Sequence, residues 1–354
     1  MKHKTLIFFA IGIIIMAIML WFIGIDEILE ALKLANPLYI LLAILLQIIT
    51  YILYTLRWQL IVNINDKNYS LKKLLPMLLV SLTVNNITPS GRGGGEPVRA
   101  YLLTQETDTP FAESFATVIT DRALDTIPFV ILAVITIIGL MTKMTLPPII
   151  LIIMILAVIA IVTLVAIIIY MSINEKFGKK VTKWLTNLII RIFKKRNPEN
   201  IKNRVEHSVT GFQHTMKTLT TNKKILYLGL PLSIIIWIFE ILRVYIVFIG
   251  FGCTVSPILI GEIFIVSSLV GMIPLLPGGL GAIDGFMILL YTTSGISTSI
   301  SAASTVVERL ISFWMTTIIG LLLIPRYGQD LFDKIYNILT KKEEEDSWNI
   351  KTSP

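Results

Sequence analysis

Long apolar runs recur along this chain of 354 residues and limit what it can fold into. A helix of about 20 apolar residues crosses a hydrocarbon core about 30 Å thick, and because lipid offers no partners to backbone polar groups, such runs must be helical. Only 15% of the residues are charged, against about 25% in soluble domains. We therefore predict an all-α, polytopic transmembrane helix bundle with about eight spans, near residues 5–25, 38–62, 72–88, 112–141, 147–171, 225–251, 257–276 and 301–325.

Basic residues are concentrated between residues 172 and 224, which hold 13 of the 31 Lys and Arg and only three acids. Positive loops mark the cytoplasmic side of a membrane protein, and lysines near both ends of the chain place both termini there as well. The chain thus divides into a first membrane half (1–171), a basic cytoplasmic amphipathic segment (172–224), a second membrane half (225–325) and a short cytoplasmic tail (326–354). The basic segment is typical either of a helix lying on an anionic leaflet or of an ordinary cytoplasmic connector.

Several classes of function receive no support from the residues. The single cysteine, Cys253, allows no internal disulfide, and the three histidines lack metal-ligand spacing. No nucleic-acid motif accompanies the net charge of +8. We expect neither a metal nor another cofactor, and no nucleic-acid partner.

Two distant stretches resemble each other. The sequence SLTVNNITPSGRGGGEPVRAYLL at 81–103 aligns with SLVGMIPLLPGGLGAIDGFMILL at 268–290, and further landmarks on both sides align at spacings of 186 to 188 residues. These landmarks are Arg57 with Arg243, and Asp121-Arg122 with Glu308-Arg309. Counted from a cytoplasmic N-terminus, the two halves have opposite orientations. Inverted repeats with discontinuous helices are the architecture of many secondary transporters.

Each copy of the repeat contains a proline and a glycine cluster that interrupt a hydrophobic helix. Pro89 lacks a backbone donor and the glycines after it permit a turn, so we predict a helix from Leu71 that breaks at 89–95 and a half-helix that begins near Glu96-Pro97. A second break is predicted at Pro277–Gly281. Helix N-termini at such breaks suit a phosphate or carboxylate, although a packing kink without a ligand is the alternative.

Charged side chains within apolar segments are the remaining candidates. A charge at the centre of a membrane helix costs about 2.5–3.5 kcal/mol, so each must pair, reach an interface or face a polar cavity. Arginine can hold a phosphate or carboxylate through its planar fork. The predicted substrate-binding residues are Arg57, Gly93, Gly94, Gly95, Glu96, Arg99, Arg243, Gly278, Gly279, Gly281 and Asp284. Structural or cavity charges are predicted at Asp121, Arg122, Asp125, Glu240, Glu308 and Arg309.

The pattern NNITPSGRGGGEPVRAYLL, followed about 180 residues later by PLLPGGLGAIDG, resembles the lysylphosphatidylglycerol synthase transmembrane region, also called the flippase-like or UPF0104 family. The resemblance covers residues from about 5 to 325 and implies a multi-pass protein of a prokaryotic cell membrane. Bifunctional members move a modified polar lipid between leaflets. They also carry a large soluble synthetase domain, for which residues 326–354 leave no room.

The resemblance and the inverted repeat together favour a non-enzymatic flippase that translocates a polar phospholipid or a lipid-linked precursor. Its partners would be membrane lipids. The first alternative is a non-catalytic membrane partner of a separate lipid-modifying or glycosyl-transferring enzyme. The second is a membrane-embedded enzyme acting on lipid-linked sugars, with Glu96 and Asp284 as acid and base.

Overall fold

The computed structural model describes residues 33–64, 68–88, 93–107, 109–143, 148–174, 198–271 and 282–327, together with residues 177, 180, 183 and 184. Several sequence predictions fall outside the described residues. These are the first span at 5–25, the second break with Gly278, Gly279 and Gly281, most of the segment 175–197, and the tail from residue 328.

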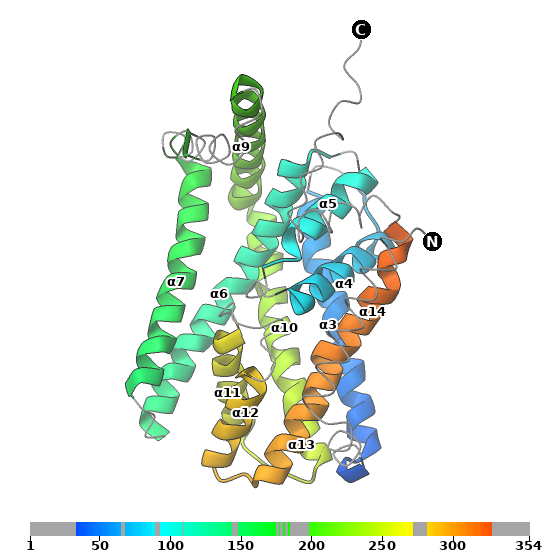
Figure 1. Ribbon diagram of the computed structural model, residues 1–354, viewed down its shortest axis with the longest axis vertical. Helices are drawn as coiled ribbons and strands as arrows, with labels where there is room; N and C mark the ends of the chain where they lie inside the picture. Colours follow the sequence, from blue (N-terminus) through cyan, green and yellow to red (C-terminus); the bar gives the residue numbers. More distant parts are fainter. Residues whose placement is uncertain are drawn as a thin grey trace.

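All the secondary structure in the described ranges is helical (Figure 1). The first half contains α3 (Pro37–Val62), α4 (Leu71–Ile87), α5 (Glu96–Thr107), α6 (Phe111–Lys143) and α7 (Pro148–Ile173). Helix α9 (Pro198–Thr221) precedes the second half. That half contains α10 (Lys223–Gly250), α11 (Pro257–Gly271), α12 (Ala282–Thr293), α13 (Thr298–Arg309), the π-helical turn η2 (Leu310–Trp314), α14 (Met315–Leu323) and the short helix η3 (Ile324–Tyr327).

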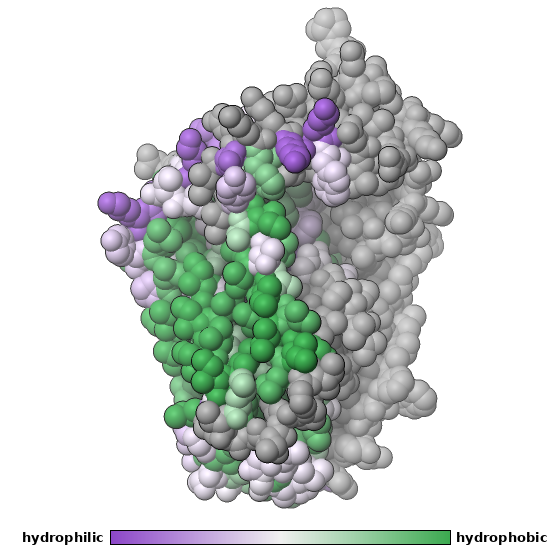
Figure 2. All heavy atoms as spheres, turned by 90° about the vertical axis from the view of Figure 1, so that its left-hand side faces the viewer, coloured by the Kyte–Doolittle hydropathy of each residue, from purple (hydrophilic) through white to green (hydrophobic). Residues whose placement is uncertain are grey.

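The prediction of a polytopic membrane bundle is confirmed. Within the described part of the chain, four helical segments are long and apolar enough to cross a membrane: Pro37–Val62, Phe111–Met141, Lys223–Gly250 and Thr298–Tyr327. Shorter apolar helices cover Leu151–Ile167, Pro257–Gly271 and Ile283–Thr293. Helix α4, with 17 residues, is at the lower limit for a span. Figure 2 shows a continuous hydrophobic surface between a strongly hydrophilic end and a weakly polar end.

Helix starts follow from local capping. The Asn36 side chain accepts a hydrogen bond from the backbone N–H of Leu38, and Pro37 occupies the first turn of α3, where its missing N–H costs nothing. Asn222 caps α10 through the N–H of Lys224, and Ser297 caps α13. These side chains satisfy backbone donors that a helix start leaves free. They fix where the long helices begin, and hence which side chains face inward.

Helices α3 and α10 occupy equivalent places in the two halves and pack side by side in opposite directions. The backbone N–H of Asn36, just before α3, donates to the carbonyl oxygen of Gly250 at the end of α10 over 2.8 Å. Further along α3, Arg57 contacts Ser233 near the start of α10. The central pair of the bundle is therefore antiparallel, as the inverted repeat predicts.

The other packing pairs repeat the same relation. Helix α4 packs on α14, and its equivalent α11 packs on α6, the equivalent of α13 with α14. Likewise α5 packs on α6 as α12 packs on α13, and α3 packs on α4 as α10 packs on α11. Each half thus lends its last long helix to the other. The exchange joins the two halves into one bundle with the charged segments of both at its centre.

The first predicted break lies where the sequence places it. Helix α4 ends before Thr88, whose backbone is extended, and α5 begins at Glu96. Gly95 lies directly against α4: a Cβ atom at Gly95 would lie 1.9 Å from the carbonyl oxygen of Ser81. The Gly95 N–H donates to the side chain of Asn85 over 2.6 Å. Only glycine allows this approach, so this residue fixes α5 against α4.

Helix α7 lies at the edge of the bundle, where it packs against α6, α9 and α11 (Figure 1). Large apolar side chains around its circumference are exposed, among them Leu156, Ile159, Leu164 and Ile167. A helix that is apolar on every side suits a lipid environment. The helix therefore presents one side to the lipid and another to the interior of the bundle.

Candidate functional site

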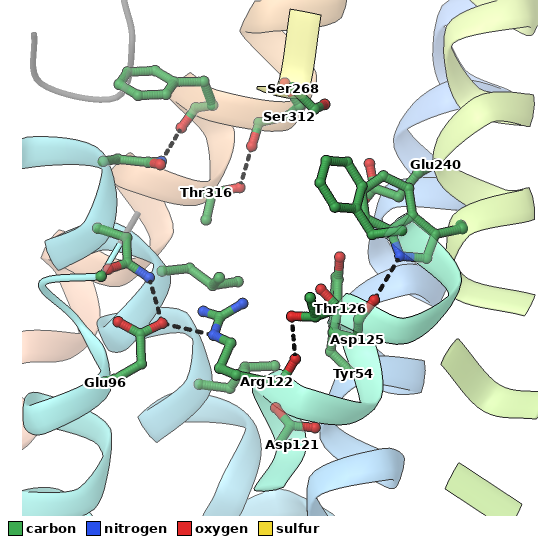
Figure 3. A pocket seen from close by; sticks show the side chains of 18 of the residues that line it. Tyr54, Glu96, Asp121, Arg122, Asp125, Thr126, Glu240, Ser268, Ser312 and Thr316 are labelled. Atoms are coloured by element: carbon green, nitrogen blue, oxygen red, sulfur yellow. Dashed lines mark hydrogen bonds and ion pairs between the residues drawn. The ribbon is translucent and has the colours of Figure 1, made fainter. Parts of the chain in front are cut away.

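A cavity of about 570 Å³ lies between the two halves, lined by side chains from α3, α4, α5, α6, α7, α10, α11, α12, α13, η2 and α14. Figure 3 shows Glu96 and Arg122 on one side of it, and Asp125, Tyr54 and Glu240 on the other. Among the lining residues are nine of the predicted charged side chains: Glu96, Arg99, Asp121, Arg122, Asp125, Glu240, Arg243, Glu308 and Arg309.

In the first half, Arg57 is held by two carboxylates of α6. Its Nε lies 2.7 Å from Asp121 Oδ1, and its Nη1 lies 2.7 Å from Asp125 Oδ1. Asp121 also accepts from Arg99 Nη1 over 2.9 Å, and the Arg99 guanidinium lies 4.8 Å from the ring centre of Trp58. Arg57 and Arg99 are fully buried. These contacts exclude the alternative that Arg57 extends to the headgroups, and they confirm that Asp121 and Asp125 share a helix face.

Glu96, in the first turn of the half-helix α5, pairs with Arg122 of α6 over 2.6 Å. Its Oε1 also accepts from the Asn85 side chain over 3.3 Å. A carboxylate at this place is favoured by the N-terminal end of the helix dipole. The Arg122 side chain remains 30% exposed, more than the other arginines in the printed ion pairs. It therefore has donors available to the cavity.

The second half repeats this arrangement. Arg243 lies 2.5 Å from Glu240 and 2.7 Å from Glu308, which confirms the i,i+3 pair on α10. Asp284, in the first turn of α12, lies 2.8 Å from Arg309. The pair Arg243–Glu308 is equivalent to Arg57–Asp121, and Asp284–Arg309 is equivalent to Glu96–Arg122. The repeat thus preserves two ion pairs in each half.

The arginines also bond across the α3–α10 contact. Arg57 Nη1 donates to Ser233 Oγ of α10 over 2.9 Å, while Arg243 Nη1 donates to Gln47 Oε1 of α3. Gln47 and Ser233 are 186 residues apart, the spacing of the two arginines themselves. Each arginine therefore uses the equivalent residue of the opposite half as a partner.

The structure brings together the charged residues that the sequence singled out, and it adds polar and aromatic groups that the sequence did not indicate. Gly93 lines the cavity, while Gly95 is buried behind it. Tyr54, Trp237 and Phe264 also line the wall. Tyrosine and tryptophan are ordinary in membrane helices, so only the packing reveals that they face the charges.

One wall of the cavity is apolar. Helix α7 contributes Ile161, Leu164 and Val165, and Leu164 is 60% exposed. Charged groups therefore meet an apolar surface inside a single cavity. Within the described residues, no three His, Cys, Asp or Glu side chains converge as ligands of a metal ion. The arrangement can hold a molecule that is polar at one end and apolar at the other.

Comparisons with known proteins agree with this architecture. A family model described as "Lysylphosphatidylglycerol synthase TM region" matches residues 9–320. A UPF0104 membrane protein of Methanothermobacter thermautotrophicus is 45% identical over 96% of this chain and 100% of its own length. A UPF0104 membrane protein of Methanocaldococcus jannaschii is 31% identical over 90% of this chain and 93% of its own. One of Pyrococcus horikoshii is 28% identical, covering 91% and 96%.

Proposed function

Because the chain belongs to the family of lysylphosphatidylglycerol synthase transmembrane regions, which includes the UPF0104 membrane proteins, we propose that it translocates a polar lipid between the two leaflets of the membrane. The observation that carries the proposal is the cavity between the inverted halves, with its charged walls and the apolar wall of α7. A lipid has the same division between a polar headgroup and apolar chains.

The size of the cavity fits one headgroup rather than a whole lipid. Small-molecule sites commonly measure about 300–1,000 Å³, and about 570 Å³ accommodates a headgroup. The acyl chains then lie along α7, where Leu164 belongs to the cavity wall and is also exposed. The lipid enters from the side and keeps its chains in an apolar environment.

Arg122 is the group best placed to bind a headgroup phosphate. Its side chain is 30% exposed and pairs with Glu96 through Nε, which leaves the end of its planar fork for a phosphate. Arg57 and Arg243 are 0% and 1% exposed, and each lies between two carboxylates. The prediction that these two hold headgroup charge stays untested. Their burial favours a role in joining the helices.

The inverted halves suit alternating access, in which one half moves against the other around a fixed site. The antiparallel α3–α10 pair would act as the pivot, because its cross-bonds involve equivalent residues on both helices. In the proposed topology, the basic end with α9 faces the cytoplasm. The chain would lie in the cell membrane of a prokaryote with both termini inside.

Reconstitution tests the proposal. The full chain is placed in liposomes with a fluorescent phosphodiester lipid, and a membrane-impermeant quencher reports transfer between leaflets. The wild type should exceed empty liposomes. A charge-assisted hydrogen bond contributes about 1.5–3 kcal/mol, so Arg122→Ala should slow transfer by about 10–150-fold. Arg326→Ala, at an exposed arginine outside the cavity, is the matched control.

Each outcome separates the alternatives. Slower transfer in Arg57→Lys or Arg243→Lys, with normal folded protein, supports the earlier prediction that these arginines hold the headgroup. Normal transfer in Arg122→Ala removes Arg122 from the site. If the wild type moves a panel of anionic and zwitterionic lipids no faster than empty liposomes, translocation of those lipids is refuted, and a non-catalytic partner of a lipid-modifying enzyme becomes the favoured function.

A further inference from the structure

The ion pairs around the cavity join eleven described residues into one network, which we call the charge cluster. Five are arginines and six are carboxylates, and every member takes part in at least one ion pair. The arginines are Arg57, Arg99, Arg122, Arg243 and Arg309, and the acids are Glu96, Asp121, Asp125, Glu240, Asp284 and Glu308. Fully ionised, this cluster of described residues carries one excess negative charge.

The repeat shows where the excess arises. In the first half three arginines balance three acids, whereas the second half has two arginines and three acids. At the spacing of the neighbouring landmarks, Arg99 is equivalent to Met287, and Glu240 is equivalent to Tyr54. An arginine has thus been exchanged for an apolar residue in the half where a carboxylate replaces a tyrosine. The imbalance is therefore specific to the second half.

An unbalanced charge inside the membrane is costly, and ionisable groups there mark ion pathways and proton relays. A buried acid that lacks a counter-charge takes up a proton instead of staying ionised. Six carboxylates and five guanidiniums reach neutrality when one proton binds. We propose that the charge cluster binds one exchangeable proton on the wall formed by Asp125 and Glu240, and that its uptake and release are coupled to lipid translocation; the coupling rests on the proposed function.

Asp125 and Glu240 are the acids that best fit this role. Each pairs with one arginine through a single oxygen, and their side chains are 16% and 12% exposed. Both line the cavity, on the same side as Tyr54 (Figure 3). Asp121 and Glu308 are only 2% and 3% exposed, and Asp121 is shared by two arginines. A proton from the cavity therefore reaches Asp125 and Glu240 more easily.

The other ionisable groups around this wall come from every neighbouring helix. Helix α3 supplies Tyr51, Tyr54 and Arg57; α5 supplies Glu96 and Arg99; α6 supplies Asp121 and Arg122; α10 supplies Arg243; α12 supplies Asp284; and α13 supplies Glu308 and Arg309. Glu262 of α11 lies against Gly139 of α6, outside the set of residues that line the cavity. The arginines disfavour a metal cation here, while a proton binds to one carboxylate without expelling them.

Infrared spectroscopy tests the proton without requiring transport. The full chain in lipid nanodiscs at neutral pH should show the carbonyl band of a protonated carboxylic acid. Asp125→Asn or Glu240→Gln leaves five acids and five arginines, so each should remove one protonated acid from the spectrum. Glu106→Gln, an exposed acid on α5, should leave the spectrum unchanged. A wild type without the band, or a band unaffected in both variants, overturns the proposal.

Transport gives the second readout. In liposomes, a pH difference should shift the distribution of the lipid between leaflets by up to tenfold per pH unit at one proton per lipid. Glu240→Gln should abolish this shift, and Glu240→Asp should restore it. Transfer that responds to a sodium gradient and not to pH overturns the coupling. If the wild type does not transfer lipid, the proposed function fails, and the infrared result still decides whether the proton is bound.

Discussion

Replacing Arg243 with methionine should destabilise the fold more than any neutralisation of a single acid in the same network. The guanidinium is 1% exposed and contacts Glu240, Glu308 and Gln47. Methionine keeps much of the side-chain volume and removes the charge. Glu240 still reaches the cavity, but Glu308 is 3% exposed and pairs with Arg243 in the described structure. The substitution therefore leaves a buried carboxylate without its counter-charge.

Two estimates of the cost agree. Breaking a buried ion pair by removing one partner costs about 3–5 kcal/mol. Alternatively Glu308 takes up a proton, and neutralising a glutamic acid of ordinary pKa about 4.3 at pH 7 costs about 3.7 kcal/mol. The second route makes the loss dependent on pH. Since the cost is then that of holding a proton in the folded state, it should shrink by about 1.4 kcal/mol for each unit that the pH falls below 7.

The double variant Arg243→Met/Glu308→Gln tests the cause. It removes the stranded charge, and replacing both members of a buried pair is often close to neutral. We expect it to recover most of the stability lost in Arg243→Met. Arg57→Met is the equivalent change in the first half and should cost less, because Asp121 keeps Arg99 as a partner.

Reversible unfolding in bicelles, followed by steric trapping, gives the free energy of unfolding for each variant. The reasoning fails if Arg243→Met costs less than about 1 kcal/mol at pH 7. It also fails if the double variant is less stable than Arg243→Met, since the stranded charge would then not be the cause.

The remaining predictions concern packing and topology. Gly95→Ala should sharply reduce the yield of folded protein, because the new Cβ would lie 1.9 Å from the Ser81 carbonyl oxygen, whereas Gly211→Ala on α9 meets no atom within 4 Å and should be tolerated; size-exclusion chromatography in detergent compares the two. Cys253, between α10 and α11, should react with a membrane-impermeant maleimide added outside intact cells, and protection there would contradict the proposed orientation. Burial raises the pKa of the Cys253 thiol, so labelling should be slow at pH 7 and faster at pH 8.5.

The sequence predicts the elements of the site better than their connections. Arg57 and Arg243 stand out in apolar runs, and Glu240 with Arg243 is recognisable from i,i+3 spacing alone. The pairing of Arg57 with Asp121, 64 residues away, depends on how α3 meets α6. Nothing local specifies that contact. The repeat could have indicated it indirectly, because it marks Arg57 and Arg243 as one equivalent pair and Asp121 and Glu308 as another.

The turn η2 shows a different limit. Residues Leu310–Trp314 wind as a π-helix directly after Arg309, although LISFW would fit an ordinary α-helix. Such turns commonly occur near functional sites, and Ser312 and Phe313 from this turn line the cavity. The equivalent part of α6 is regular. Hydrophobic periodicity does not distinguish the two, since the difference lies in backbone hydrogen bonds.

The bonding of Arg57 to Ser233 and of Arg243 to Gln47 has the form of an isologous interface, in which residue i of one subunit contacts j of the other and j contacts i. Such an interface is what two identical polypeptides inserted in opposite directions would share. The present chain can thus be understood as a fused antiparallel dimer whose ancestor was a single half-length gene. Separate expression of 1–190 and 191–354 should accordingly allow the two fragments to recombine in one membrane, held by contacts that predate the fusion.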